Sequence, residues 1–284
     1  MRRQRLDAEL VRRGLARSRE HAARLIADRR VHVAGTPATK PATAVATDVA
    51  ITVVEDHMGT EYVSRGGHKL AGALDSFGKA GLAVAGKDAL DAGASTGGFT
   101  DVLLRRGARS VAAVDVGYGQ LAWSLRNDDR VTVFERTHVN DLTPQLLPCT
   151  PNLVVADLSF ISLTKTLPAL ARVAGEDADF VVLVKPQFEV GRDGVGKGGV
   201  VRDPTRRADA VLVVASAAPA GLGVAGICVS PLRGPAGNFE YFLWLRPGAP
   251  ALVREVVERV VTEQAGSQVT PRRKPSGSGE RLGT

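Results

Sequence analysis

The chain has 284 residues, of which 44% are hydrophobic and 24% charged, with a net charge of +7 and two cysteines. This length allows one large or two smaller globular domains with a sizeable core. No apolar run approaches the roughly 18 residues of a membrane span, and the N-terminus lacks the apolar stretch of a signal peptide. We therefore expect a cytoplasmic protein without a membrane partner. The two cysteines lie far apart without metal-ligand spacing, so neither a disulfide framework nor a metal site is predicted.

The positive charge is concentrated at the two ends of the chain. Residues 1–30 contain ten arginines against four acids, and the segment from Gly266 onward contains four basic residues against one acid. Because each phosphate neutralised by an arginine releases a counterion, this distribution favours a polyanionic partner bound by the N-terminal segment. A solvated basic surface without a partner is the alternative.

The first 55 residues have the pattern of a small α-α-β unit. Residues 5–13 repeat apolar residues at helical spacing, a second helix begins with Ser18 as N-cap, and short strands are expected at 31–33 and 50–54. The pattern R-L-D-x-x-L-V-x-x-G-L-A-x-S-R-x-x-A-x-x-L-I-x-x-x-x-V-x-V-x-G, from Arg5 to Gly35, resembles the S4 RNA-binding domain. We expect RNA contacts from Arg3, Arg5, Arg17, Ser18, Arg19 and, after a polar linker, Arg65.

Beyond the linker, short buried strands alternate with helices, which predicts a parallel sheet covered on both faces. The expected strands are 88–91, 110–116, 131–134, 152–157, 180–185, 224–229 and 240–245. No helix separates the last two, so we expect an antiparallel hairpin at the sheet edge. A seven-stranded sheet with a reversed last strand looks like the Rossmann-like methyltransferase fold, in which ligands bind at the strand C-termini.

The stretch from Lys87 to Thr100 predicts a strand, a glycine-rich loop and a helix ending before Gly107. Its spacing, D-x-G-x-x-x-G-G, fits neither a dinucleotide fingerprint nor a P-loop. Asp91, at the strand end, could face a cationic ligand, and the glycines could let a carboxylate-bearing tail lie against the backbone. S-adenosylmethionine has both a cationic centre and such a tail. A second acid, Asp115 at the end of the next strand, is placed to accept from ribose hydroxyls. The expected cofactor contacts are Asp91, Gly93, Ala94, Ser95, Thr96, Gly97, Gly98, Phe99, Asp115, Val116 and Asp157.

An ordinary α/β turn with two solvated acids is the alternative reading of that loop. A second glycine-rich stretch, Gly191 to Gly198, has G-x-x-x-x-G-K but carries Gly198 where a P-loop needs a Ser or Thr hydroxyl for magnesium. We therefore expect no ATP site there.

Four charged residues are expected around one crevice: Lys69, Asp157, Lys185 and Glu240. Lys69 occupies the first turns of a helix, where the helix dipole opposes a cation, so another interaction must account for it. Pro186 ends the strand after Lys185, whose amine needs a neighbouring acid such as Asp157. The order K-D-K-E resembles the catalytic tetrad of FtsJ-type ribose 2′-O-methyltransferases. Enzymes that methylate base nitrogens often carry an Asn/Asp-Pro-Pro-aromatic stretch after the fourth strand, where this chain reads Asp157-Leu-Ser-Phe160. The absence of that stretch argues against base N-methylation.

Further stretches, among them Val-Ser-Arg-Gly-x-His-Lys-Leu, Asp-Val-Gly-Tyr-Gly-Gln-Leu-Ala-Trp and Pro-x-Gly-Asn-x-Glu-Tyr-Phe, extend the resemblance over about residues 3–248. Together they are similar to the TlyA family, the haemolysin-named ribosomal RNA 2′-O-methyltransferases of mycobacteria and related bacteria. The resemblance implies S-adenosylmethionine as donor and a cytidine ribose of 16S or 23S rRNA, in 30S and 50S subunits or their precursors, as acceptor. A monomer is favoured.

These observations predict four segments along the chain. An S4-like domain spans 1–58, a linker 59–64, an FtsJ-like methyltransferase domain 65–265 and a disordered basic tail 266–284. The alternative function is a non-catalytic S4-domain ribosome-assembly factor that keeps the methyltransferase-like fold. A pore-forming haemolysin is not supported by a chain without a membrane segment.

Overall fold

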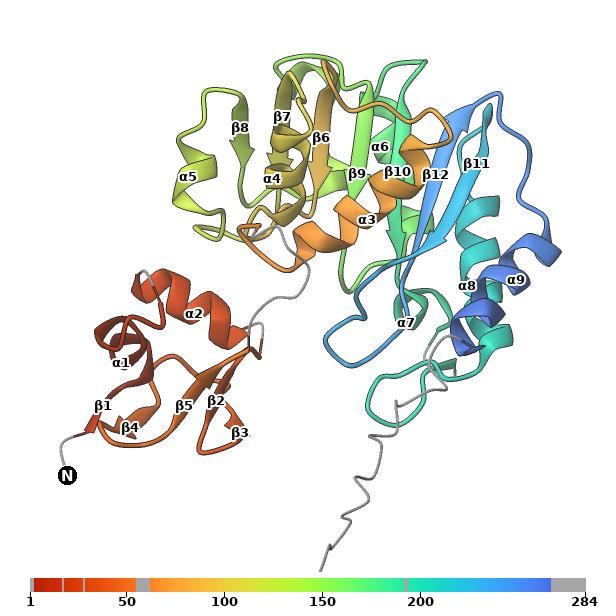
Figure 1. Cartoon of the computed structure of the whole chain (residues 1–284). Coiled ribbons are helices and arrows are strands. Elements are labelled where there is room, and N and C mark those ends of the chain that lie inside the picture. Colours follow the sequence, from red (N-terminus) through yellow and green to blue (C-terminus); the bar gives the residue numbers. More distant parts are fainter. Residues whose placement is uncertain (1–2, 17, 28, 55–61, 192–193, 267–284) are drawn as a thin grey trace, which may run out of the picture.

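The computed structural model describes residues 3–16, 18–27, 29–54, 62–191 and 194–266 (Figure 1). Residues 59–61 of the expected linker and nearly all of the expected basic tail lie outside these ranges, as does Arg17. The described chain forms a small N-terminal part and a larger α/β part (Figure 1).

Two helices and two small sheets make up the N-terminal part. The helices are α1 (Leu6–Arg12) and α2 (Arg19–Ala27); the strands are β1 (Arg3–Arg5), β2 (Val31–Val33), β3 (Thr36–Pro37), β4 (Ala44–Ala46) and β5 (Ile51–Val53). Both helices and the strands β2 and β5 confirm the sequence prediction, and the Ser18 hydroxyl accepts from the backbone N–H of His21 as a helix cap does. Strands β1, β3 and β4 were not predicted, because they lack the β-branched apolar pairs that mark β2 and β5.

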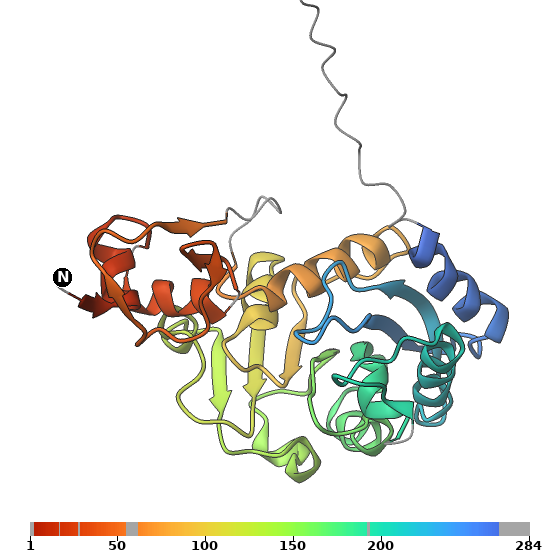
Figure 2. The ribbon, with the colours of Figure 1, turned by 90° about the horizontal axis from the view of Figure 1, so that it is seen from below.

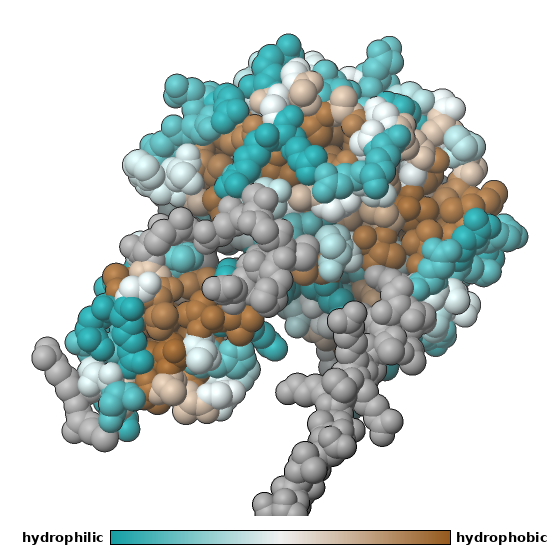
Figure 3. All heavy atoms as spheres, viewed as in Figure 1, coloured by the Kyte–Doolittle hydropathy of each residue, from teal (hydrophilic) through white to brown (hydrophobic). Residues whose placement is uncertain are grey.

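A buried acid joins the first helix of this part to its strands. Glu9 is fully buried and accepts hydrogen bonds from Arg12 and Arg13, and these bonds lower the pKa of its carboxyl to about 2. Arg13 also donates to the backbone oxygens of Thr47 and Val49. In Figure 3 hydrophilic side chains gather over α1, while the surface next to it is hydrophobic. Arg12 and Arg13 therefore form contacts within the N-terminal part itself.

The larger part is built on a seven-stranded sheet in the order β11-β12-β10-β9-β6-β7-β8. Its strands are β6 (Asp88–Ala92), β7 (Ser110–Val114), β8 (Val131–Phe134), β9 (Leu153–Ala156), β10 (Asp179–Val184), β11 (Leu222–Val229) and β12 (Tyr241–Pro247). Strand β12 pairs antiparallel with both β10 and β11, and the pairs among β10, β9, β6, β7 and β8 are parallel. The predicted sheet with a reversed last strand and an antiparallel edge hairpin is confirmed.

Helices cover both faces of this sheet (Figures 1 and 2). Apolar residues of α3 (Gly66–Gly78) and α4 (Gly98–Arg105) form one core with one face of the strands, and those of α6 (Leu167–Val173), α8 (Pro204–Ser216) and α9 (Arg254–Gly266) form a second core with the other face. The central strands are therefore buried on both sides, which is why they read as continuous apolar runs instead of alternating.

The strand ends differ from the sequence prediction in a way that matters for the site. Asp157 and Lys185 follow β9 and β10 instead of forming their last residues, and Glu240 precedes β12 instead of beginning it. Asp115 follows β7, although the predicted strand ran to residue 116. Parallel strands β7, β9 and β10 end at the same edge at which the antiparallel β12 begins. All four side chains are therefore carried to one edge of the sheet by short connections.

Candidate active site

The glycine-rich loop after β6 is shaped by close packing within the protein. Gly93 and Gly97 have φ angles of +87° and +96°, which favour glycine. A Cβ on Gly93 would lie 2.7 Å from the carbonyl oxygen of Asp157, and one on Gly97 would collide with Leu125. Packing within the protein therefore requires a glycine at both positions, a reason that the sequence prediction did not include. Gly93 lines the cavities described below, whereas Gly97 is required by its contact with Leu125.

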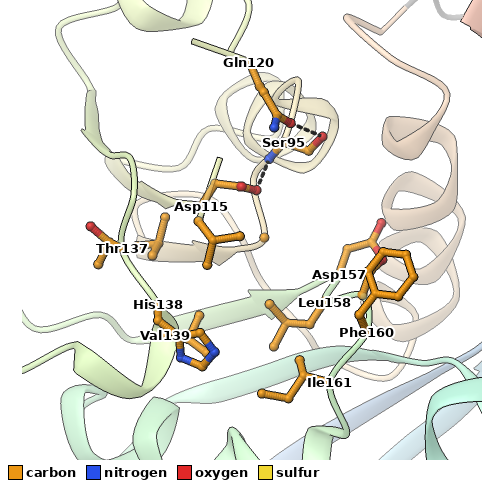
Figure 4. A pocket seen from close by; sticks show the side chains of 14 residues that line it. Ser95, Asp115, Gln120, Thr137, His138, Val139, Asp157, Leu158, Phe160 and Ile161 are labelled. Carbon is orange, nitrogen blue, oxygen red and sulfur yellow. Dashed lines mark hydrogen bonds between the residues drawn. The ribbon is translucent and has the colours of Figure 1, made fainter. Parts of the chain in front are cut away.

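A cavity of about 530 Å³ opens at the carboxyl ends of β6, β7, β8 and β9 (Figure 4). Its residues are Gly93, Ser95, Val114, Asp115, Val116, Gln120, Thr137, His138, Val139, Asp157, Leu158, Ser159, Phe160 and Ile161. The carboxylate of Asp115 accepts from the backbone N–H groups of Ser95, at 2.8 Å, and Gly117, at 2.6 Å. These bonds fix the carboxylate at the cavity wall, and each oxygen retains a lone pair for a ligand.

A second cavity of about 290 Å³ adjoins the first, because Gly93, Ser95, Asp157 and Ser159 line both. Its residues are Ser64, Arg65, Gly66, Lys69, Gly93, Ala94, Ser95, Thr96, Gly98, Phe99, Asp157, Ser159, Lys185, Pro235 and Glu240. The four charged residues that the sequence predicted at one crevice are thus brought together. They form two ion pairs.

The first pair joins Lys69 of α3 to Glu240. The Lys69 ammonium donates to Glu240 Oε2 at 2.5 Å, and the two side chains are only 6% and 1% exposed. The Glu240 carboxylate therefore accounts for the presence of a lysine in the first turns of α3, where the helix dipole alone would disfavour a positive charge. The other carboxylate oxygen of Glu240 has no hydrogen-bond partner within the described part of the chain.

The second pair joins Lys185 to Asp157, with 2.6 Å between Lys185 Nζ and Asp157 Oδ1. The same ammonium donates to the Ser159 hydroxyl at 2.8 Å and lies 5.9 Å from the ring centre of Phe188. The predicted partnership of Lys185 and Asp157 is confirmed. Since neighbouring strands β9 and β10 both end here, their connections bring the two charges together.

Asp91 does not reach either cavity, contrary to the expectation that its carboxylate faces a cationic ligand. It is fully buried at the end of β6 and accepts from the Thr100 hydroxyl of α4 at 2.6 Å. Burial raises the pKa of this carboxyl to about 7, an effect that the Thr100 hydrogen bond partly offsets. The hydrogen bond between Thr100 and Asp91 therefore joins the start of α4 to strand β6.

The predicted RNA-binding residues separate into two groups. Arg3, Arg5, Ser18 and Arg19 lie exposed on the N-terminal part, where Arg5 and Arg19 both pair with Asp7. These pairs lower the pKa of the Asp7 carboxyl, the Arg5 hydrogen bond having the largest effect. Arg65 instead lines the second cavity beside Lys69 and donates to the backbone oxygen of Arg233.

Several cavity residues were not predicted. They are Ser64, Gly66, Val114, Gln120, Thr137, His138, Val139, Leu158, Ser159, Phe160, Ile161 and Pro235. Residues 137–139 and 158–161 follow strands β8 and β9, so the rule that singled out Asp115 and Asp157 would have reached them. Phe160 combines 91% exposure with a φ of +65°, an unusual backbone conformation for an aromatic residue. Pro235 lies in the connection between β11 and β12, which are antiparallel, so the rule about the ends of parallel strands does not apply to it.

Neither a metal centre nor a membrane span is found in the ranges that the structure describes. No group of three or more His, Cys, Asp or Glu residues there could hold an ion. No described helix is long and apolar enough to cross a bilayer.

Comparison with known families assigns both parts of the chain. The model of the FtsJ-like methyltransferase family matches residues 62–247, and that of the S4 domain matches residues 4–51. The 16S/23S rRNA (cytidine-2′-O)-methyltransferase TlyA of Mycobacterium tuberculosis strain H37Rv is 62% identical over 246 residues, which cover 86% of this chain and 90% of that protein. The chain belongs to the TlyA family of FtsJ-like methyltransferases.

Other relatives of this TlyA-family chain carry a different name. Hemolysin A of Brachyspira hyodysenteriae is 38% identical over 240 residues, covering 84% of this chain and 97% of that protein. A solved structure described as a candidate hemolysin from Streptococcus thermophilus superposes with a TM-score of 0.71 at 35% identity, covering 94% of this chain and 97% of the other. The family is thus a methyltransferase family in which some members are named for haemolysis, and this chain is a methyltransferase of that family.

Proposed function

We propose that this chain transfers the methyl group of S-adenosylmethionine to the 2′-hydroxyl of a cytidine in 16S rRNA, 23S rRNA or both. The observation that carries the proposal is the meeting of two lysine–carboxylate pairs, Lys69–Glu240 and Lys185–Asp157, in one cavity. That cavity adjoins a larger one whose wall carries Asp115. The relative with 62% identity is named for this reaction on both rRNAs.

The larger cavity fits S-adenosylmethionine in size and in its polar groups. Its volume of about 530 Å³ lies within the range of roughly 300 to 1,000 Å³ that is usual for small-molecule sites. Asp115 would accept from the ribose hydroxyls, and the apolar side chains of Val116, Val139 and Ile161 would pack against the adenine. When bound, S-adenosylmethionine supplies an electrophilic methyl group.

The residues of the smaller cavity would act on the ribose. A ribose hydroxyl is a poor nucleophile at neutral pH, so it must be oriented and its loss of a proton stabilised. Lys185 is held by Asp157 and Ser159 with its ammonium in the cavity, where it can hydrogen-bond the hydroxyl oxygen and stabilise the charge that develops there. The proton that the hydroxyl loses would pass to the Asp157 carboxylate, which lines the same cavity. The buried pair of Lys69 and Glu240 forms another part of the cavity wall and places a second ammonium there.

The N-terminal domain would hold the RNA. Arg3, Arg5 and Arg19 are exposed on it, and an S4 domain matches residues 4–51. We propose residues 1–58 as the RNA-binding domain and 65–265 as the catalytic domain, with Arg65 contributing a phosphate contact at the edge of the active site.

Transfer of tritiated methyl groups to 16S and 23S rRNA, as naked RNA and in 30S and 50S subunits, tests this proposal. We expect incorporation that depends on S-adenosylmethionine, and mapping of the product should place it at a cytidine 2′-oxygen. Binding of rRNA without any methyl transfer would overturn the proposal and support the non-catalytic assembly factor.

A further inference from the structure

A buried side-chain amide joins two loops beside the active site. Asn238 is 1% exposed; its Oδ1 accepts from the backbone N–H of Val201 at 2.9 Å, and its Nδ2 donates to the carbonyl oxygen of Gly199 at 2.7 Å. The amide thus pairs with segment 199–201 as a neighbouring strand would. Val201 is itself 2% exposed, so the contact is made in the interior, where hydrogen bonds are strong and costly to lose.

The backbone of Asn238 holds the turn that packs against Glu240. Its carbonyl oxygen accepts from the N–H of Gly234 at 3.0 Å, and the N–H of Gly237 donates to Gly234 at 2.8 Å. The α-carbon of Gly234 is so close to the Glu240 carboxylate that an added Cβ would lie 2.5 Å from Oε1. The position of this turn therefore limits where the carboxylate can lie.

The same connection also contacts the helix that carries Lys69. The guanidinium of Arg65, at the start of α3, donates to the carbonyl oxygen of Arg233 at 3.2 Å, and Pro235 forms part of the cavity wall. Residues 230–239 consequently contact Glu240 through Gly234 and the start of the Lys69 helix through Arg233. Asn238 links this connection to segment 199–201, which leads into α8.

We infer that Asn238 is a positioning residue for methyl transfer: it acts through Gly234 to hold the Glu240 carboxylate against Lys69. This inference rests on the proposed function. Lys69 and Glu240 are buried, and a buried ion pair is favourable only while its geometry is kept. Loss of the Asn238 amide would let the turn shift and would misplace the pair without removing any group that touches the ligands.

The test compares Asn238→Ala with Asn152→Ala. The side-chain oxygen of Asn152 accepts from the backbone N–H of Asp88, at the amino-terminal ends of β6 and β9 and away from both cavities. Asn152→Ala therefore removes a hydrogen-bonding amide from the same sheet as a control. We expect Asn238→Ala to lower kcat by at least roughly tenfold, since a misplacement of about 1 Å can cost about 100-fold. KM for S-adenosylmethionine and for rRNA should stay within about twofold of the parent, and Asn152→Ala should keep the parental kcat.

A second variant keeps the inference testable if Asn238→Ala does not fold. Gly234→Ala leaves the Asn238 hydrogen bonds intact but places a methyl group against Glu240 Oε1, so it should also lower kcat with little change in either KM. Circular dichroism and thermal melting identify the folded variants. Folded Asn238→Ala or Gly234→Ala with the parental kcat would overturn the inference, as would an equal fall of kcat in Asn152→Ala. A parent protein that transfers no methyl groups would instead refute the proposed function.

Discussion

Lys69 and Glu240 lie 171 positions apart in the chain, yet their charged atoms are 2.5 Å apart and almost completely buried. The reversal of strand β12 produces this contact, because it brings the start of the last strand to the edge where the parallel strands end. Together with Lys185 and Asp157, the pair places two positive and two negative charges around one small cavity. The following predictions test the roles of the residues around it.

Replacement of Lys185 by Ala should remove methyl transfer while leaving RNA binding nearly unchanged. We expect the single-turnover rate to fall by at least roughly 100-fold, which is the size of effect that groups acting on the reacting proton and oxygen have. Rates with tritiated donor and affinities from filter binding give the two quantities. Lys79→Ala, which alters an exposed lysine just after α3, is the control and should behave as the parent. A near-parental rate in Lys185→Ala would show that the tetrad is assigned wrongly.

Replacement of Asp115 by Ala should weaken the binding of S-adenosylmethionine. Loss of hydrogen bonds to a charged acceptor costs about 1.5 to 3 kcal/mol, so the Kd measured by calorimetry should rise by roughly 10- to 100-fold. Asp129→Asn removes an exposed carboxylate outside the cavities and should leave the Kd unchanged. Equal Kd values for the parent and Asp115→Ala would exclude Asp115 as a cofactor contact.

Replacement of Arg5 and Arg19 by Ala should weaken rRNA binding and make it less sensitive to salt. The log–log slope of affinity against salt concentration should fall by roughly one unit for each phosphate that the variant no longer neutralises. Both guanidinium groups are more than half exposed, although each also pairs with Asp7. Arg259→Ala, on α9, serves as the control. An unchanged affinity and slope in the double variant would show that the S4 domain does not anchor the RNA.

Replacement of Asp91 by Asn should change how stability depends on pH. The pKa of Asp91 is raised to about 7 in the folded chain from an ordinary value of 3.8, mainly by burial and to a lesser extent by the charges of Asp157 and Asp115. Asp91 therefore holds its proton more tightly in the folded protein than in the unfolded chain. The stability that this protonated carboxyl contributes is lost as the pH rises from about 4 to about 7. Between pH 5 and pH 8 the parent should lose about 2 to 3 kcal/mol of unfolding free energy relative to Asp91→Asn, at about 1.4 kcal/mol per pKa unit.

Urea denaturation at several pH values measures this difference. Asp129→Asn, which makes the same substitution at an exposed position, is again the control and should give the profile of the parent. Identical profiles for the parent and Asp91→Asn would mean that Asp91 is ionised in the folded protein at pH 5.

Replacement of Gly97 by Ala should destabilise the fold whether or not a ligand is bound. The residue has a φ of +96°, and a Cβ there would collide with Leu125, so we expect a loss of about 1 to 3 kcal/mol. Gly78→Ala at the end of α3 is the matched control, since an added Cβ there meets nothing within 4 Å. That change should be neutral or stabilising by up to about 1 kcal/mol. A stable Gly97→Ala protein would contradict the packing described here.

Most of the fold could be predicted because its signals are local. The runs of Val and Leu in β9 and β10, and the helical spacing in α1, depend on each residue and its near neighbours in the chain. Site residues could be predicted where a simple topological rule applied, namely that parallel strands end at one edge. Asp115, Asp157 and Lys185 were located by this rule, and they line the two cavities.

What the sequence by itself determined is therefore the order and type of the elements and the edge at which the charged residues gather. Only the tertiary structure decided which carboxylate faces a cavity and which is sealed below it, as Asp115 and Asp91 show. It likewise decided that Arg65 lines the smaller cavity and that Asn238 joins two loops. Local periodicity fixes the face on which a side chain lies, whereas burial and hydrogen-bond partners depend on segments distant in sequence that pack against that face.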